Sequence, residues 1–77
     1  MNTREQFVVD TIIEILKGKG SDTSKLDFKS EAHLRDDLGL SSFNLAELTV
    51  KIEHEFDVDI FEKGLIFTLG EVFDRLN

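Results

Sequence analysis

Nucleophilic or acid–base chemistry in this chain would have to come from its serines, its two histidines and its many acids, because cysteine is absent. Any thiol chemistry therefore needs a sulfur that a prosthetic group brings. His33 and His54 have no cysteine to pair with, and a Ser-His-Asp site needs a pocket that 77 residues can hardly build. We therefore expect surface roles for both histidines and no enzyme activity.

Clustered acids raise the separate question of a cation site. Asp57 and Asp59 stand where a calcium loop would begin. An EF-hand loop needs glycine at its sixth position and glutamate at its twelfth, where this chain has Thr68. We therefore reject an EF-hand and predict no dedicated metal site, while weak divalent binding by the clustered acids stays open.

The charge balance of the chain limits its partners. Sixteen acidic residues against nine basic ones give a net charge of −7. Nucleic-acid binding needs clustered cations, so we exclude it. An acidic surface suits partners that present Lys and Arg patches and dock in a salt-sensitive way, although solubility alone would also explain the charge.

Length and hydropathy set the organisation of the chain. Its 77 residues allow one domain, residues 1–77, and we expect a monomer. No apolar run reaches the roughly 20 residues of a membrane span. The N-terminal residues lack the basic and apolar stretches of a secretory signal, and the absence of cysteine is compatible with the cytosol. We therefore expect a cytoplasmic location.

Apolar periodicity predicts three clear helices and one doubtful one. The first runs from about residue 3 to residue 17, with Thr3 and Gln6 at capping-box spacing. The last begins after Thr68, which has the same spacing to Glu71. The second strong helix starts at one of two adjacent serines, runs to about residue 55 or 56, and has an apolar stripe of Leu45, Leu48, Ile52 and Phe56.

Two connections complete the predicted fold. The polar segment from residue 18 to about 41 contains Leu26 and Phe28, which we expect to anchor it, and a helical turn near residues 31–36. A short helix over about residues 61–66 is doubtful because Gly64 weakens it, and a β-like stretch over residues 58–61 competes with it. We predict an all-α, small four-helix bundle with three main helices, a short third helix, and a long loop between helices 1 and 2.

The most informative segment surrounds the start of the second strong helix. It contains Asp36-Asp37-Leu38-Gly39, then Ser42, then Glu47-Leu48, and finally Glu55-Phe56. In this joint pattern, and in length, acidity and helix order, the chain resembles the acyl carrier protein family. Members of that family have a leucine-acid-acid-leucine-glycine lead, a modified serine that opens a helix, a Glu-Leu pair one turn later, and an acidic stretch that ends in phenylalanine.

The resemblance implies that a phosphopantetheinyl transferase attaches 4'-phosphopantetheine from coenzyme A to Ser42. The thiol of that arm would carry acyl groups as thioesters to enzymes of fatty-acid, polyketide or specialised lipid or secondary-metabolite pathways. A phosphodiester at a helix N-terminus gains from the positive end of the helix dipole, and Gly39 lets the backbone turn before the helix. Ser41 replaces the usual aspartate of the family. This makes either serine a candidate, and the spacing to Glu47-Leu48 selects Ser42.

The resemblance also implies a docking surface for acyl-transferring and acyl-modifying enzymes that present basic patches. The residues that correspond to it are Asp36, Asp37, Phe43, Glu47 and Glu53. Phe43 stands where relatives have leucine, so the position stays apolar. Lys51 and His54 dilute the acidic face of the helix. This favours a specialised set of partners and a dedicated pathway.

Alternatives remain open at this point. The chain can instead be a non-carrier acidic helical interaction module in which Ser42 is an unmodified helix N-cap. Peptidyl carriers usually have a glycine-rich lead, whereas the lead here is of the acyl type, and a domain that starts at Met1 favours a discrete protein over a piece of a megasynthase. In the family the core can open to shelter an acyl chain; we predict simple core roles for Phe7, Ile12, Leu45, Leu48, Ile52, Ile60, Ile66 and Phe73.

Overall fold

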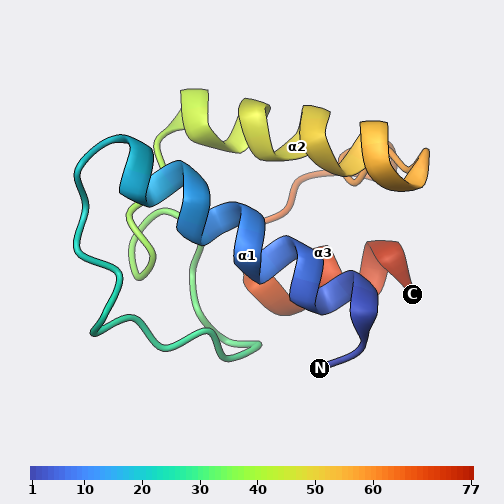
Figure 1. The fold of residues 1–77 in the computed structure, drawn as a ribbon. Coiled ribbons are helices and arrows are strands. Elements are labelled where there is room, and N and C mark those ends of the chain that lie inside the picture. Colours follow the sequence, from blue (N-terminus) through green and yellow to red (C-terminus); the bar gives the residue numbers. More distant parts are fainter.

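The computed structural model describes all residues of the chain, 1–77, and contains three helices. They are α1, Thr3–Gly18; α2, Ser42–Phe56; and α3, Leu69–Leu76. α1 lies between the other two helices and contacts both (Figure 1). There is no strand, only an isolated antiparallel bridge between His33 and Thr68. The all-α class is therefore confirmed. None of the three helices has both the length and the apolar character needed to span a bilayer.

α1 is capped by a different pair of residues from the one that the sequence suggests. The Asn2 side chain accepts a hydrogen bond from the Glu5 N–H at 2.9 Å, and the Glu5 carboxylate accepts one from the Asn2 N–H. The predicted pair of Thr3 and Gln6 is therefore wrong. The opposite end of the chain favours the observed pair, because Asn77 donates to Glu5 and accepts from the Asn2 side chain.

The long connection between α1 and α2 is held against the segment that leads into α3. As predicted, Leu26 and Phe28 are half-buried and pack against the core. Gly70 lies so close to this connection that a Cβ atom there would stand 3.0 Å from the Ser30 carbonyl oxygen. Three backbone hydrogen bonds join the two segments, from the N–H groups of Leu34, Leu69 and Gly70 to the carbonyls of Phe67, Ala32 and Ser30.

The short third helix predicted over residues 61–66 does not form, and neither does the competing strand. Hydrogen-bonded turns take its place. Asp57 ends α2 in the left-handed region with φ 58°, and Gly64 has φ 129°, a conformation that interrupts a helix and suits glycine. Arg75 of α3 donates a hydrogen bond to the Ile60 carbonyl at 3.0 Å. In a helix this carbonyl would instead accept a hydrogen bond from a backbone N–H four residues later. The bundle therefore has three helices.

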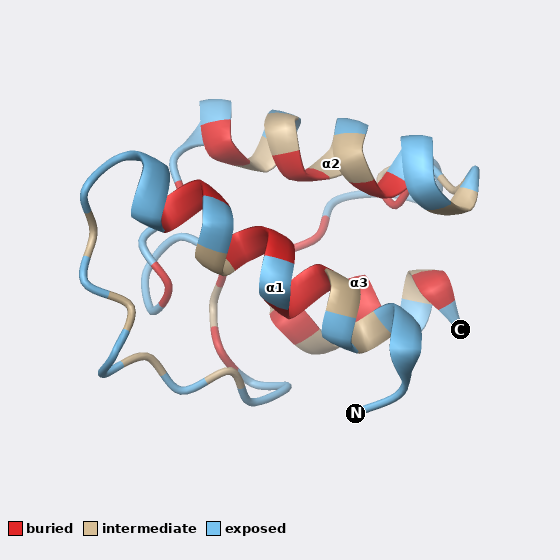
Figure 2. Ribbon diagram, in the orientation of Figure 1, coloured by how far each residue is buried: buried red, intermediate tan, exposed pale blue.

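The core is a cluster of 17 buried apolar residues drawn from all three helices and both connections (Figure 2). The predicted core residues Ile12, Leu48, Ile52, Ile60, Ile66 and Phe73 are buried. Phe7 and Leu45 are half-buried at its edge. The ring of Phe7 packs edge-on against Phe56, with 5.1 Å between ring centroids. α2 therefore faces the core mainly through Leu48 and Ile52.

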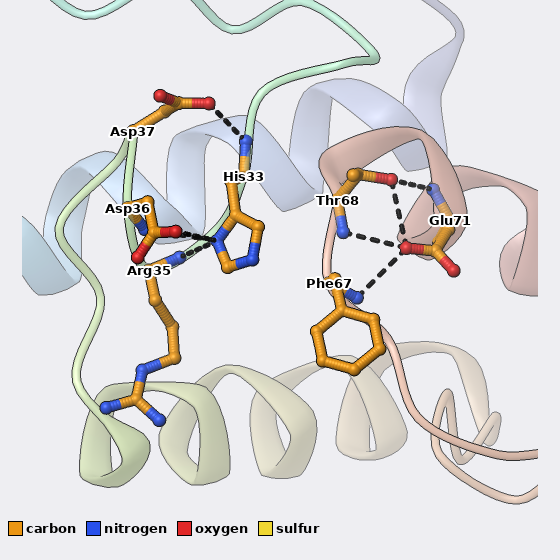
Figure 3. A network of polar contacts seen from close by, with 7 residues as sticks. All are labelled: His33, Arg35, Asp36, Asp37, Phe67, Thr68 and Glu71. Atoms are coloured by element: carbon orange, nitrogen blue, oxygen red, sulfur yellow. Dashed lines mark hydrogen bonds and ion pairs between the residues drawn. The ribbon is translucent and has the colours of Figure 1, made fainter.

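α3 begins with the capping box that the sequence predicts. The Thr68 hydroxyl accepts a hydrogen bond from the Glu71 N–H. In return the Glu71 carboxylate accepts from the N–H groups of Phe67, at 3.0 Å, and Thr68, at 2.9 Å (Figure 3). These hydrogen bonds from Phe67 and Thr68 lower the pKa of Glu71, because they stabilise its charged form.

Candidate functional site

The two adjacent serines at the start of α2 have different roles. Ser41 is the N-cap: its hydroxyl accepts a hydrogen bond from the Asn44 N–H at 3.0 Å, and its own N–H donates to the Asn44 side chain at 3.0 Å. Ser42 is the first helical residue and is exposed, and its hydroxyl makes no protein hydrogen bond. The interpretation of Ser42 as the helix cap is therefore wrong, because Ser41 occupies that position.

The backbone before α2 is fixed by its own turn. Buried Leu38 and Leu40 flank Gly39. Gly39 has φ 82°, a left-handed conformation that makes the turn predicted at this glycine. The Leu40 N–H donates to the Leu34 carbonyl at 3.0 Å, which closes the turn. Buried Leu38 and Leu40, with the turn at Gly39 between them, therefore fix the position of the two serines at the surface.

Lys19, just after α1, is a residue at this site that sequence reasoning missed. Its ammonium group donates to the Gly39 carbonyl at 2.8 Å and to the Asn44 Oδ1 at 2.9 Å. It thereby ties the end of α1 to the start of α2. No local pattern signals this contact, because the two partners of Lys19 lie 20 and 25 residues away in the sequence.

Two positive groups stand at the start of α2, the helix N-terminus and Lys19. No acid stands in the first turn of the helix, and Asn44, rather than a glutamate, completes the capping box. The helix dipole places partial positive charge on the N-terminal N–H groups, and Lys19 adds a full charge beside them. A hydroxyl in this position can carry a group linked through phosphate, since an anion here is stabilised.

Asp36 and Asp37 lie in the turn that leads to α2 (Figure 3). Asp37 accepts a hydrogen bond from the His33 N–H at 2.7 Å, while Asp36 lies 3.9 Å from the His33 Nδ1. That nitrogen accepts from the N–H groups of Arg35 and Asp36. Both carboxylates remain exposed, so they hold the turn and still face solvent.

The predicted docking acids do not form one continuous patch on α2. Glu47 is half-buried and Glu53 exposed. They are six positions apart in the sequence, which places them about 120° apart around the helix. The face between them is apolar: Phe43 is 79% exposed and Val50 is 68% exposed. We call Phe43, Ala46 and Val50 the outer stripe of α2. Their i, i+3, i+7 spacing is visible in the sequence.

Two shallow hollows open on this side of the molecule. One, of about 420 Å³, is formed by the outer stripe together with Glu47 and Lys51. The other, of about 300 Å³, lies between α1 and α2 and includes Phe7 and Thr11. Val50 and Lys51 line both hollows, so the two adjoin.

Comparisons with known proteins give one consistent result. Residues 6–71 match the family model described as a phosphopantetheine attachment site. Among similar proteins, an acyl carrier protein of an Exiguobacterium species is 31% identical, with 91% of this chain and 89% of that protein covered. One of Amoebophilus asiaticus is 33% identical, covering 99% and 91%. A mitochondrial acyl carrier protein of Saccharomyces cerevisiae is 30% identical, covering 97% and 64%. No solved structure gives a significant match.

Proposed function

Because this chain belongs to the acyl carrier protein family, whose members carry acyl groups on a covalently attached 4'-phosphopantetheine, we propose that Ser42 is the attachment residue. One observation carries this assignment: of the two serines, only Ser42 has an exposed hydroxyl without a hydrogen-bond partner in the protein. Ser41 uses its hydroxyl to cap α2, and its modification would remove that cap.

The surroundings of Ser42 fit a phosphodiester. The first turn of α2 contains no acid that would repel it. Its N–H groups point toward the serine end of the helix, and the dipole there favours a negative charge by about 0.3–1 kcal/mol. Lys19, held at the same helix end through Asn44, supplies a cation. Ser41 is uncharged where the family usually has aspartate, so it does not oppose the phosphate.

Attachment requires one displacement at phosphorus. The Ser42 hydroxyl loses its proton to a base of the transferase, and its oxygen bonds to the phosphorus that bears the pantetheine group of coenzyme A. The bond from that phosphorus to the nucleotide part of coenzyme A breaks, and the nucleotide leaves. When bound, the group supplies the thiol that this chain lacks, since it has no cysteine. The chain itself presents cargo to enzymes and catalyses none of their steps.

We propose that the transferase and the acyl-processing enzymes dock over the start and outer face of α2. Phe43 offers an exposed apolar contact beside Ser42, and Glu47, Glu53, Asp36 and Asp37 offer charges to basic patches. Because the acids are dispersed around apolar residues, apolar contact contributes more to the binding of a partner enzyme here than it would on a purely acidic surface. This arrangement supports a specialised partner set and a dedicated pathway.

A charge reversal tests the docking surface. Glu47→Lys should weaken binding to a partner enzyme severalfold at low salt and less at high salt, since screening reduces the lost attraction. Glu62→Lys, in the turn before α3, makes the same charge change at an exposed position away from α2. Equal affinities of wild type and Glu47→Lys at low salt would rule out a contribution from Glu47.

Intact mass measures the attachment directly. The protein is incubated with coenzyme A and a broad-specificity phosphopantetheinyl transferase, in wild-type form and as Ser42→Ala and Ser41→Asp. Aspartate caps a helix as well as serine does, so Ser41→Asp removes the neighbouring hydroxyl without removing the cap. We expect a gain of one phosphopantetheine in wild type and Ser41→Asp and none in Ser42→Ala.

A gain in the wild type and in Ser42→Ala, but none in Ser41→Asp, would assign the modification to Ser41. No gain in the wild type with several transferases would refute the carrier function of this chain. Circular dichroism of each variant before incubation ensures that a missing gain reflects the missing hydroxyl and not an unfolded protein.

A further inference from the structure

The imidazole of His33 caps the turn that leads into α2. Its Nδ1 accepts hydrogen bonds from the backbone N–H groups of Arg35, at 3.2 Å, and Asp36, at 3.1 Å. The His33 backbone N–H donates to the Asp37 carboxylate at 2.7 Å, and the His33 carbonyl accepts from the Asp37 N–H at 3.0 Å. This is the arrangement of a helix cap, in which a side chain satisfies free N–H groups at the start of a turn. The ring therefore takes the place that serine, aspartate or asparagine usually occupies in a cap.

The ring of His33 can cap the turn only while Nδ1 carries no proton. A neutral imidazole has one nitrogen that accepts and one that donates, whereas in the charged form both nitrogens donate. The two N–H groups directed at Nδ1 therefore require the neutral form with its proton on Nε2. Protonation of Nδ1 removes both hydrogen bonds and leaves their donors facing another N–H donor. Histidine is the side chain whose charge ordinarily changes between about pH 5 and pH 8.

Asp36 offers a second partner to the protonated ring. Its exposed Oδ2 lies 3.9 Å from the His33 Nδ1, within the distance of an ion pair (Figure 3). A charged ring would donate to this carboxylate instead of accepting from the backbone N–H of the same residue. His33 thus has two alternative sets of partners, and its charge selects between them. Because Asp36 is one of the acids proposed for docking, the exchange also occupies a docking charge.

The segment before α3 packs against the other side of His33. The ring centroids of His33 and Phe67 are 6.1 Å apart, and Thr68 forms the isolated antiparallel bridge with His33. The titratable group of that segment is Glu71, whose pKa lies below its ordinary value of 4.5 because it accepts hydrogen bonds from Phe67 and Thr68. The charged residues on the turn itself are Arg35, Asp36 and Asp37. Among these residue types, histidine is the one that ordinarily titrates between about pH 5 and pH 8.

The capped turn sets the backbone that carries Ser42. The Leu34 N–H donates to the Phe67 carbonyl at 2.8 Å, and the Leu40 N–H donates to the Leu34 carbonyl at 3.0 Å. Leu40 directly precedes the serine pair. The N–H groups that His33 caps lie between these two leucines in the sequence, so opening the cap frees the end of the turn that holds Ser42. Both leucines are buried, which confines the change to the turn.

We propose that His33 is a pH-sensitive positioning residue for the attachment at Ser42. With the ring neutral, the turn is capped and presents the Ser42 hydroxyl to the transferase. With the ring protonated, the cap opens, Asp36 pairs with the ring, and attachment slows. This role depends on the attachment proposed for Ser42. The change involves one proton from solvent and an exchange of hydrogen bonds, and no covalent step.

Nitrogen-15 NMR of the unmodified wild-type protein tests the cap itself. Between about pH 8 and about pH 5.5 the His33 Nδ1 should become protonated. The amide signals of Arg35 and Asp36 should move with the same midpoint, and these amides should lose protection from hydrogen exchange. His33→Asn places an amide oxygen near the position of Nδ1, which caps but does not titrate, so it should abolish these changes. His54→Asn removes the other histidine, which is exposed on α2, and should preserve them.

The rate of attachment tests the consequence for Ser42. Wild type and His33→Asn are loaded from coenzyme A by the same transferase at about pH 8 and about pH 5.5. The ratio of the two rates at each pH cancels the pH dependence of the transferase and that of the net charge of −7, which both proteins share at pH 7. We expect a ratio near one at the higher pH. At the lower pH the wild type should be severalfold slower than His33→Asn.

Each other outcome overturns the inference or the function on which it rests. Amide signals of Arg35 and Asp36 that do not follow the protonation of His33 would rule out the cap. A rate ratio that is the same at both pH values would rule out the positioning role and leave the attachment intact. Loss of the helical circular dichroism signal at the lower pH would also overturn it, since the change would then not be local. A wild type that several transferases fail to load at the higher pH would instead refute the proposed function.

Discussion

Removing the Ser41 hydroxyl should destabilise the protein, whereas removing the Ser42 hydroxyl should not. In Ser41→Ala the Asn44 N–H loses its acceptor at 3.0 Å, and α2 loses half of its capping box. Replacing an N-cap serine by alanine costs about 0.5–2 kcal/mol, typically near 1. The second bond of the box, from the Ser41 N–H to Asn44, is unaffected. We therefore expect a cost of about 1 kcal/mol.

The corresponding change in thermal midpoint is readily measured. For a domain of this length, 1 kcal/mol shifts the midpoint by about 4–8 °C. Thermal unfolding of the unmodified protein, followed by circular dichroism, should show a fall of this size for Ser41→Ala. Ser42→Ala replaces an exposed helical serine by the best helix former, so its midpoint should stay unchanged or rise slightly.

Ser41→Asp is the control, because aspartate also caps a helix and its charge favours the N-terminal end of the dipole. Its midpoint should match or exceed that of the wild type. An equal fall in Ser41→Ala and Ser42→Ala, or a fall in Ser42→Ala alone, would contradict the division of roles between the serines. Loss of the Ser41 hydroxyl should therefore lower stability, whereas loss of the Ser42 hydroxyl should abolish the mass gain.

Three further predictions concern packing, charge and pH. Leu48→Ala, in the filled core, should cost about 2–5 kcal/mol, while Val50→Ala, on the exposed stripe, should change the free energy of unfolding by less than about 0.5 kcal/mol in denaturant titrations. With a net charge of −7, moderate salt or magnesium should raise the thermal midpoint, and an unchanged midpoint would argue against self-repulsion. The lowered pKa of Glu71 means that its contribution to stability is present above its ordinary value of 4.5 and is lost as the pH falls through the lower folded-state value. Glu71→Gln keeps an acceptor oxygen but cannot titrate, so its midpoint should fall less than that of the wild type between about pH 6 and pH 3; parallel curves would refute this.

Interactions within a few residues were readable from the sequence. The apolar periodicity located all three helices, because each buries one face and needs that spacing. The cap formed by Thr68 and Glu71 and the backbone turn at Gly39 were also predicted. The resemblance around Ser42 indicated the family, which the comparisons confirmed.

For the cap of α1 and for the segment before α3, the sequence allowed more than one local structure, and contacts with distant residues selected between them. Asn2 caps α1 in a cluster that includes the last residue of the chain. The segment before α3 remains non-helical while Arg75 holds the Ile60 carbonyl. No local pattern could rank these options, because the groups that decide them lie 15 to 75 residues away.

The sequence by itself determined that this is a small, acidic, helical domain that resembles acyl carrier proteins and has a serine pair at the start of a helix. Only the tertiary structure decided how the two serines divide their roles, because capping depends on the backbone geometry that buried Leu38, Leu40 and the Lys19 bridge impose. It also decided that Phe43 and Val50, on the other side of α2, stay exposed. The predicted stripe through Leu48 and Ile52 is buried, and α1 can cover only one face of the helix.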